Sequence, residues 1–355
     1  MNPTPISRVL KFATLAALAF GVVSTDAAPL YRLESALTIK SPSAPSWDYL
    51  TFDVSHDYLY IARRDDGILI YDAKAKKITG AIENSQGGNA TVLVPEFDRG
   101  FVINQDGSTT IFQLSTLKTL SRAKFGEDAD NGFYDGVTKQ ILITQGDSGQ
   151  ATFLDAKTGA VTGVLKIDSN SLEGVAPDGE GNFFMALRDR DKVIKIDGRT
   201  RALVAEWKVI GHKLPNGVAY DAANQRVFVS TRGENPALLV FDAVSGKVVA
   251  EPVIGRGNDQ VIFDAAAKKI YTSNGFDGTL VIVEQVDANT YKLAEAATTR
   301  PYARTMALDP KTKTVYLTTA EGTVDPAKAW KTSVAPFYPN TYFKDTFVLL
   351  TYSPK

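Results

Sequence analysis

The chain has 355 residues, with 39 basic and 40 acidic side chains and a formal net charge of −1. This balance gives no overall reason for the protein to bind nucleic acid or anionic lipid. The sequence contains no cysteine, which excludes disulfides, thiolate catalysis and attachment through a lipidated cysteine. It also contains no nucleophile elbow, phosphate loop or HExxH motif, so it gives no support to a hydrolytic triad.

The first 27 residues have the features of a secretory signal peptide. Arg8 and Lys11 give a positively charged start, and the apolar run FATLAALAFGVV follows. Thr25-Asp26-Ala27 then offers a small-x-small cleavage site. The apolar run is too short to cross a bilayer. We therefore expect residues 1–27 to be removed, and residues 28–355 to be exported to the periplasm as a single domain that does not insert into the membrane.

The repeat unit is clearest in residues 213–255. Four short β-prone runs, GVAYD, RVFVST, ALLVFD and KVVAEPVI, alternate there with polar, glycine- or proline-containing turns. Runs of this length and spacing predict a four-stranded antiparallel meander. One meander cannot bury both of its faces, so it needs similar units beside it.

The same unit recurs along the chain. An aspartate follows the first strand at Asp221, Asp264 and Asp309, which are 43 and 45 residues apart, and also at Asp53 and Asp135. Second strands recur as LYIAR, FVINQ, ILITQ, FFMAL, VFVST, IYTSN and VYLTT. A period in the low forties with four strands per unit predicts a β-propeller, and seven units predict seven blades.

The last unit lacks a fourth strand after residue 352, whereas residues 31–39 resemble the fourth strands of other units. We therefore expect the N-terminal strand to close the last blade. That blade also carries a long loop, residues 320–344, which is rich in aromatic residues and proline. Loops of this length in compact domains are commonly functional, and the aromatic content argues against disorder.

Two family resemblances follow from these motifs. IYTSN and VYLTT, together with VFDAVSGKVV, resemble the YVTN-repeat propellers, especially the periplasmic YncE-like group, over essentially the whole mature chain. That resemblance implies a seven-bladed ring and a binding role, with DNA as the ligand in one case. It does not imply a shared reaction.

Locally, Pro215-Asn216-Gly217 and Asp130-Asn131-Gly132 resemble gluconolactonase and senescence-marker propellers. Those enzymes hold a divalent cation on the axis. The chain departs from their other motifs, with Ser46-Trp47-Asp48 in place of Glu-Gly-Pro and Asn258-Asp259-Gln260 in place of Pro-Asp-Gly.

Propeller topology places the segments that lead into the innermost strands on one face, together with the loops between second and third strands. We call this the top face. Acidic and amide side chains in the leading segments are expected to ring the mouth of the central channel, where hard oxygen ligands suit Ca²⁺ or Mg²⁺. Two carboxylates ~7 Å apart repel by ~2.4 kcal/mol at a dielectric of ~20, so they need a cation, Arg304 or water. The predicted metal ligands are Asp48, Glu173, Asn216 and Asp259; the alternative is that these side chains only cap backbone N–H groups.

Arginines and the aromatic residues of the long loop form a second predicted set on the top face. Guanidinium groups recognise carboxylate and phosphate, and aromatic rings stack on bases or sugars, so single-stranded nucleic acid is conceivable. The alternative is ion pairing with neighbouring acids. His56 is expected on the opposite face, and His212 in a top-face loop. The predicted ligand-binding residues are Arg63, Arg188, Arg232, Arg304, Trp330, Phe337 and Tyr342.

The sequence therefore predicts an all-β, seven-bladed propeller. Its leading function is non-catalytic binding of a small molecule or protein partner at the top face by a monomer. A divalent-metal-dependent lactonase or related hydrolase is the alternative, and a scaffold for a protein complex is a third.

Overall fold

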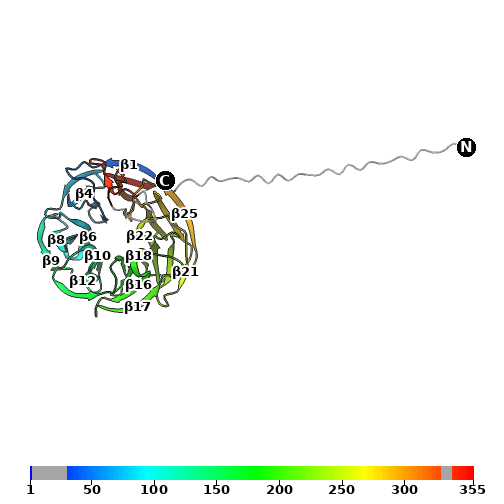
Figure 1. Ribbon diagram of the computed structural model, residues 1–355, viewed down its shortest axis with the longest axis horizontal. Helices are drawn as coiled ribbons and strands as arrows, with labels where there is room; N and C mark the ends of the chain where they lie inside the picture. Colours follow the sequence, from blue (N-terminus) through cyan, green and yellow to red (C-terminus); the bar gives the residue numbers. More distant parts are fainter. Residues whose placement is uncertain (2–29, 329–337) are drawn as a thin grey trace.

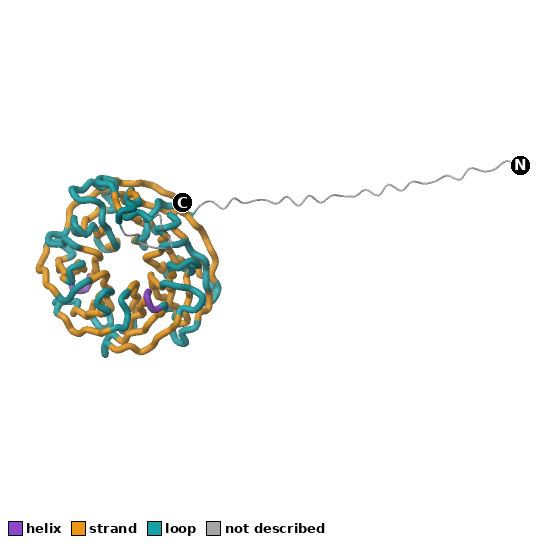
Figure 2. Tube along the Cα trace, in the orientation of Figure 1, coloured by secondary structure: helices purple, strands orange, loops and turns teal. Residues whose placement is uncertain are grey.

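A computed structural model describes Met1, residues 30–328 and residues 338–355. These residues form seven four-stranded antiparallel sheets arranged as blades around an axis, which is the predicted β-propeller (Figures 1 and 2). Helical structure in the described residues consists of two single-turn 3₁₀ helices, η1 (Pro95–Phe97) and η2 (Arg188–Arg190). Within the same residues, no helix has the length and apolar character needed to span a membrane.

Each blade runs from an inner strand beside the axis to an outer strand at the rim. From inner to outer strand, the first four blades are β2 (Leu50–Asp53), β3 (Tyr58–Ala62), β4 (Ile68–Asp72), β5 (Lys77–Ala81); β6 (Gly88–Val94), β7 (Arg99–Asn104), β8 (Ser108–Gln113), β9 (Thr119–Lys124); β10 (Ala129–Asp135), β11 (Gln140–Gln145), β12 (Gln150–Asp155), β13 (Val161–Lys166); and β14 (Leu172–Pro177), β15 (Asn182–Leu187), β16 (Lys192–Asp197), β17 (Ala202–Lys208). The last three are β18 (Pro215–Asp221), β19 (Arg226–Thr231), β20 (Leu238–Asp242), β21 (Val248–Ala250); β22 (Asn258–Asp264), β23 (Lys269–Asn274), β24 (Thr279–Gln285), β25 (Tyr291–Thr298); and β26 (Met306–Leu308), β27 (Val315–Thr319), β30 (Val348–Pro354), β1 (Tyr31–Thr38).

The N-terminal strand closes the ring, as predicted. β1 pairs antiparallel with the C-terminal strand β30, from Tyr31 opposite Pro354 to Thr38 opposite Val348. The Tyr31 side chain is buried, and its hydroxyl donates to the carbonyl oxygen of Lys313 at 2.9 Å and lies 2.9 Å from the Tyr271 hydroxyl. Because the two ends of the described chain share one sheet, no blade is left with an open seam.

The recurring aspartates after the inner strands fix the turns on the face opposite the top. Asp53, Asp135, Asp221, Asp264 and Asp309 are all buried, and each accepts a backbone N–H from a residue two or three positions later. A short side-chain acceptor that bonds its own turn in this way lets the chain reverse without unpaired amides. The repeat seen in the sequence is therefore a repeat of turn chemistry.

The hydrophobic core lies between neighbouring blades. Second strands are almost continuously buried, as in β11 and β15, because both faces of each blade are covered by its neighbours. Between the last blade and the first, Trp47, Leu59, Phe347 and Leu349 form one buried cluster. This packing holds the top-face loops at a fixed distance from the axis.

The long loop of the last blade is partly described. Strands β28 (Gly322–Thr323) and β29 (Thr341–Tyr342) form a short hairpin at its base. The Asn340 amide oxygen accepts the Asp325 backbone N–H at 2.8 Å, and the Asn340 side-chain NH₂ donates to the Asp325 carbonyl at 2.9 Å. The described parts of the loop are thus tied to each other above the ring.

Candidate functional site

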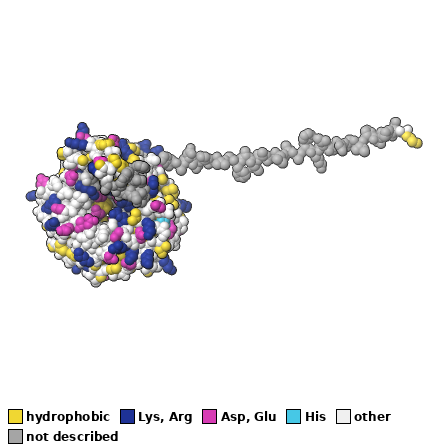
Figure 3. Space-filling model, in the orientation of Figure 1, with side chains coloured by type: hydrophobic (Ala, Val, Ile, Leu, Met, Phe, Trp, Pro, Cys, Tyr) yellow, Lys and Arg dark blue, Asp and Glu magenta, His cyan; other side chains and the backbone are white. Residues whose placement is uncertain are grey.

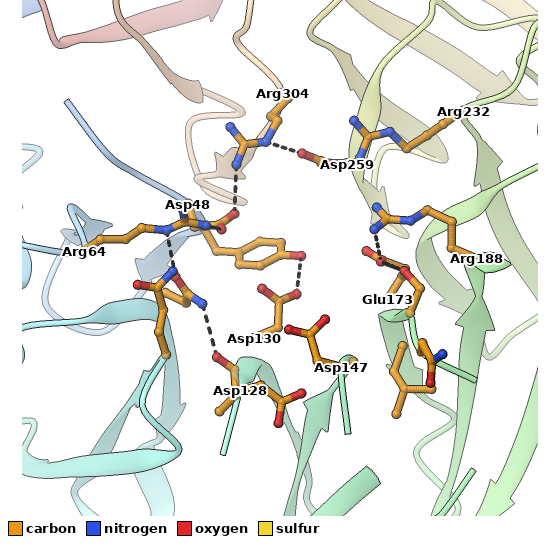
Figure 4. Close-up of a pocket in the computed structure, with 18 of the residues that line it drawn as sticks. Asp48, Arg64, Asp128, Asp130, Asp147, Glu173, Arg188, Arg232, Asp259 and Arg304 are labelled. Atoms are coloured by element: carbon orange, nitrogen blue, oxygen red, sulfur yellow. Dashed lines mark hydrogen bonds and ion pairs between the residues drawn. The ribbon is translucent and has the colours of Figure 1, made fainter. Parts of the chain in front are cut away.

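The mouth of the central channel holds a cavity of about 510 Å³ on the top face. Figure 3 shows the ring hollowed near its centre, with acidic and basic side chains beside the hollow. Segments leading into inner strands and loops between second and third strands supply the lining, as propeller topology predicts. The charged residues that line it are Asp48, Arg64, Asp128, Asp130, Asp147, Glu173, Arg188, Arg232, Asp259 and Arg304 (Figure 4).

The four arginines are tied to carboxylates or amides in one continuous network. Arg64 bonds Asp48 and donates through Nε to the Asn89 amide oxygen at 2.9 Å. Arg304 bridges Asp48, at 3.4 Å, and Asp259. Each link joins side chains from different blades or from different loops of one blade.

The network continues from Asp259 through the fifth and fourth blades. Arg232 pairs with Asp259, and the Asn216 side-chain NH₂ donates to the Asp259 carboxylate at 3.2 Å. Arg188 donates to the Asn216 amide oxygen at 3.3 Å and pairs with Glu173 at 2.8 Å. The chain of contacts thus crosses six blades, from Asn89 in the second blade to Glu173 in the fourth.

The network stabilises the charged forms of Arg304 and Asp259. Burial acts to lower the pKa of Arg304, but the carboxylates of Asp48 and Asp259 outweigh it and raise that pKa well above its usual value. Burial acts to raise the pKa of Asp259, but Arg232, Arg304 and Arg188 outweigh it and lower that pKa. Arginine and carboxylate therefore keep each other ionised at the mouth.

The third blade breaks this pattern. It contributes three carboxylates, Asp128, Asp130 and Asp147, and within the described residues none of them lies in an ion pair. Figure 4 shows them across the cavity from Arg304. Desolvation by burial, followed by the negative charges of Asp48 and Glu173, raises the pKa of Asp130 well above its usual value. The lining as a whole has six carboxylates against four guanidinium groups.

Aromatic side chains wall one side of the cavity, and one of them, Tyr338, belongs to the long loop. The ring centroid of Tyr338 lies 3.8 Å from that of Tyr302 and 4.5 Å from that of Phe276, and Tyr338 and Tyr302 both line the cavity. The guanidinium of Arg304 lies 5.1 Å from the Tyr302 centroid, within cation–π range. The long loop therefore reaches the mouth, as predicted from its position between the second and third strands of the last blade.

Only some of the predicted ligand-binding residues line the cavity. Arg188, Arg232 and Arg304 line the cavity. Tyr342 packs instead on Trp47, with ring centroids 4.9 Å apart. Trp330 and Phe337 lie outside the described residues.

Arg63 does not line the cavity; its neighbour Arg64 does. Arg63 is fully buried, with its guanidinium 4.1 Å from the Phe347 ring centroid and 2.8 Å from an Asp66 carboxylate oxygen. Arg64 has a φ of 44°, in the left-handed region, and this local turn separates the directions of the two side chains. Burial also lowers the pKa of Arg63.

The four predicted metal ligands gather at the mouth, but they already have partners. Asp48 and Asp259 bond guanidinium groups from two arginines each, Glu173 bonds Arg188, and Asn216 bridges Arg188 and Asp259. Their oxygen atoms are thus engaged by cationic donors, which makes this donor set a poor fit for a divalent cation. Among the described residues, no three His, Asp or Glu side chains are grouped so that they could hold a metal ion.

The two histidines lie away from the cavity. His56 Nδ1 is 2.8 Å from an Asp53 carboxylate oxygen in the turn opposite the top face, as expected. His212 Nδ1 is 2.8 Å from the Asn235 carbonyl oxygen, in a separate depression between the fourth and fifth blades. Neither histidine lines the mouth.

The sequence did not single out Tyr49, Asp128, Asp147 or Tyr338 as site residues. Asp147 sits in the loop between the second and third strands of its blade, a position that topology already assigned to the top face. Asp128 has a φ of 46° just before β10, and its carboxylate accepts the Ser148 backbone N–H at 2.9 Å. Position in the repeat was the signal that could have identified both.

Comparison with known proteins supports the fold and gives no family. No family model matches the chain, and no curated protein matches it. Among solved structures, a chain of the hydrazine synthase of Kuenenia stuttgartiensis is similar, with a TM-score of 0.68 and 15% identity over 79% of this chain and 94% of that chain. A chain of the mitotic checkpoint complex has a TM-score of 0.69 and 15% identity over 88% of this chain and 95% of that chain. The RRP9 WD40 repeats have a TM-score of 0.70 and 8% identity over 92% of this chain and 97% of that chain. At these identities the likeness shows the propeller fold alone.

Proposed function

We propose that this protein is a non-catalytic binding protein of the YVTN-repeat type, exported to the periplasm, that takes a small ligand into the top mouth of its channel. One observation carries the proposal: a cavity of about 510 Å³ whose lining carries ten charged side chains, including one wall of carboxylates without cationic partners among the described residues. A concave shape and polar groups that can fix a ligand's orientation are features of small-molecule sites. The signal-peptide features of residues 1–27 and the recurring strand motifs support the location and the family.

The paired side of the cavity favours binding over catalysis. The arginine–carboxylate network keeps its members bonded to one another, which leaves no unpaired carboxylate among Asp48, Glu173 and Asp259 to act as a base or nucleophile. General acid–base catalysis needs a side chain whose pKa lies near the working pH and that can reach the substrate proton. His212, which the sequence placed in a top-face loop, lies outside the cavity and cannot act there as a base.

A thermal-shift screen tests the proposal. The purified chain is heated with separate probes: primary amines, amino acids, dicarboxylates, sugar phosphates, Ca²⁺ and Mg²⁺. A probe at about a hundredfold excess over its Kd adds ~2.7 kcal/mol to stability. A shift by an organic probe supports binding, whereas a shift by Ca²⁺ or Mg²⁺ alone would favour the metal-dependent lactonase.

A matched pair of variants locates the effect. Asp147→Arg reverses a charge at an exposed turn that lines the cavity, and Glu127→Arg makes the same change at an exposed neighbour that does not line it. We expect Asp147→Arg to abolish the shift and Glu127→Arg to preserve it. Equal shifts in both variants would place the ligand elsewhere and refute the proposed site.

A further inference from the structure

The central channel has two sections of different character. Below the charged mouth lies a second cavity of about 660 Å³, lined by inner-strand residues of six blades. Tyr49 lines both cavities, so its side chain marks the junction between them. The lower cavity continues to the turns at Val54, Ala265 and Pro310, on the face opposite the top.

The lower section is mainly apolar. Phe52, Leu93, Phe133 and Ile262 line it from four different blades, and each is half-buried. The same four side chains also pack against the buried clusters between the blades. Half-buried apolar side chains around one passage are a surface that an apolar ligand chain could cover.

The unpaired negative charge of the mouth lies at this junction. The Tyr49 hydroxyl, from the first blade, donates to the Asp130 carboxylate of the third blade at 3.4 Å. Asp128 and Asp147 flank Asp130 in the same blade, and one buried oxygen of Asp128 has no donor among the described protein groups. The four guanidinium groups of the cavity are held by other carboxylates. A ligand thus meets uncompensated negative charge directly above an apolar passage.

We propose that the channel binds an amphipathic primary amine, with its ammonium group among Asp128, Asp130 and Asp147 and its unbranched apolar chain directed past Tyr49 into the lower section. This inference rests on the proposed function and names the ligand class for the same site. An ammonium group has three donors and no acceptor, which suits a cavity wall lined by carboxylates. The raised pKa of Asp130 agrees with a site that lacks a cation.

Other ligand classes fit less well. An anionic head group would have to displace carboxylates from the arginines and would face three further carboxylates across the cavity. A wholly polar polyamine would satisfy the carboxylates but would leave the apolar section in contact with water. Only a molecule with a cationic end and an apolar chain complements both sections.

Isothermal titration of the purified chain with n-butylamine, n-hexylamine and n-octylamine tests the inference, with butanoic, hexanoic and octanoic acids as matched controls. Each added methylene is expected to lower Kd by about fourfold, the equivalent of ~0.8 kcal/mol. The acids are expected to bind at least tenfold more weakly. Asp130→Asn, which keeps the shape of the side chain, is expected to weaken the amines at least tenfold.

Val54→Lys provides the second readout, because it adds a charge at the lower end of the channel, far from the mouth. This substitution should weaken the binding of n-octylamine more than the binding of n-butylamine. Amines that bind without a chain-length effect, or whose affinity is unchanged in Asp130→Asn, would overturn this inference. If amines fail but another screening probe binds in a manner sensitive to Asp147→Arg, the inference fails and the proposed function stands. If no probe binds, both fail.

Discussion

The arginine–carboxylate network should contribute substantially to stability, and Asp259→Asn tests this most sharply. Asp259 bonds both Arg232 and Arg304 and accepts from the Asn216 amide. Only 11% of its side chain is exposed. The substitution keeps the shape but leaves two nearly buried guanidinium groups without their shared counter-charge.

The expected loss of folding stability follows from the burial of the Asp259 ion pairs. Removing one partner of a buried ion pair costs about 3–5 kcal/mol, and access of water to the mouth reduces this to about 2–4 kcal/mol. With an unfolding entropy of ~2.1 cal/mol/K per residue, a domain of about 300 residues should lose ~3–6 °C in Tm. The assay is thermal unfolding by circular dichroism, with urea titration as a second measure.

Asp277→Asn is the matched control. Asp277 pairs with Arg256 on the same face, but 47% of the Arg256 side chain and 29% of the Asp277 side chain are exposed. An exposed pair contributes about 0–1 kcal/mol. Equal losses in the two variants would refute the view that the mouth network is a special contributor.

The pH dependence gives a further check on the same variant. Because the pKa of Asp259 is lowered in the folded protein, its stabilisation is present above the ordinary pKa of about 3.9 and is lost as pH falls through the folded value. The difference between the unmodified protein and Asp259→Asn should therefore be full at pH 7 and should shrink below about pH 3.9. A difference that grows on acidification would contradict the reasoning.

Three further predictions concern other parts of the molecule. Asp130→Asn should raise Tm at pH 7, because a raised folded pKa means that the ionised carboxylate destabilises the fold; the gain should vanish below about pH 3.9, where this carboxyl is protonated in the unfolded state as well, and a loss of stability at pH 7 would contradict this. Deleting residues 31–38 should cost more than ~5 kcal/mol in urea unfolding, because β30 and its buried side chains become an open edge, and unchanged stability would refute ring closure by β1. Tyr338→Ala should leave Tm within about 2 °C, since no blade strand is altered, yet should weaken any mouth ligand several-fold; unchanged affinity would show that the aromatic wall does not contact the ligand.

The propeller could be predicted because the repeat consists of residue types that act locally, within one turn or one strand. Aspartates such as Asp221 and Asp264 recur at the same turn in five of the seven blades, and the second strands are buried on both faces. Neither feature depends on distant contacts. Ring closure followed from one missing strand at the C-terminal end and one surplus strand at the N-terminal end.

Propeller topology predicted which residues lie at the mouth of the channel, but it did not predict how they pair with one another. Position in the repeat correctly assigned Asp48, Glu173, Asp259 and Arg304 to the mouth. The ion pairs could not be predicted, because they join blades far apart in the sequence, such as Arg304 with Asp48. The choice between Arg63 and Arg64 depended on one left-handed residue, which no repeat pattern encodes.

The most direct test of the central claim is a crystal structure of the protein with the organic probe that gives the largest thermal shift. The account predicts that the probe lies in the top mouth of the channel, within hydrogen-bonding distance of at least one third-blade carboxylate and in contact with Tyr49 or Tyr338. A probe bound on an outer strand or on the opposite face, with the mouth unoccupied, would contradict it.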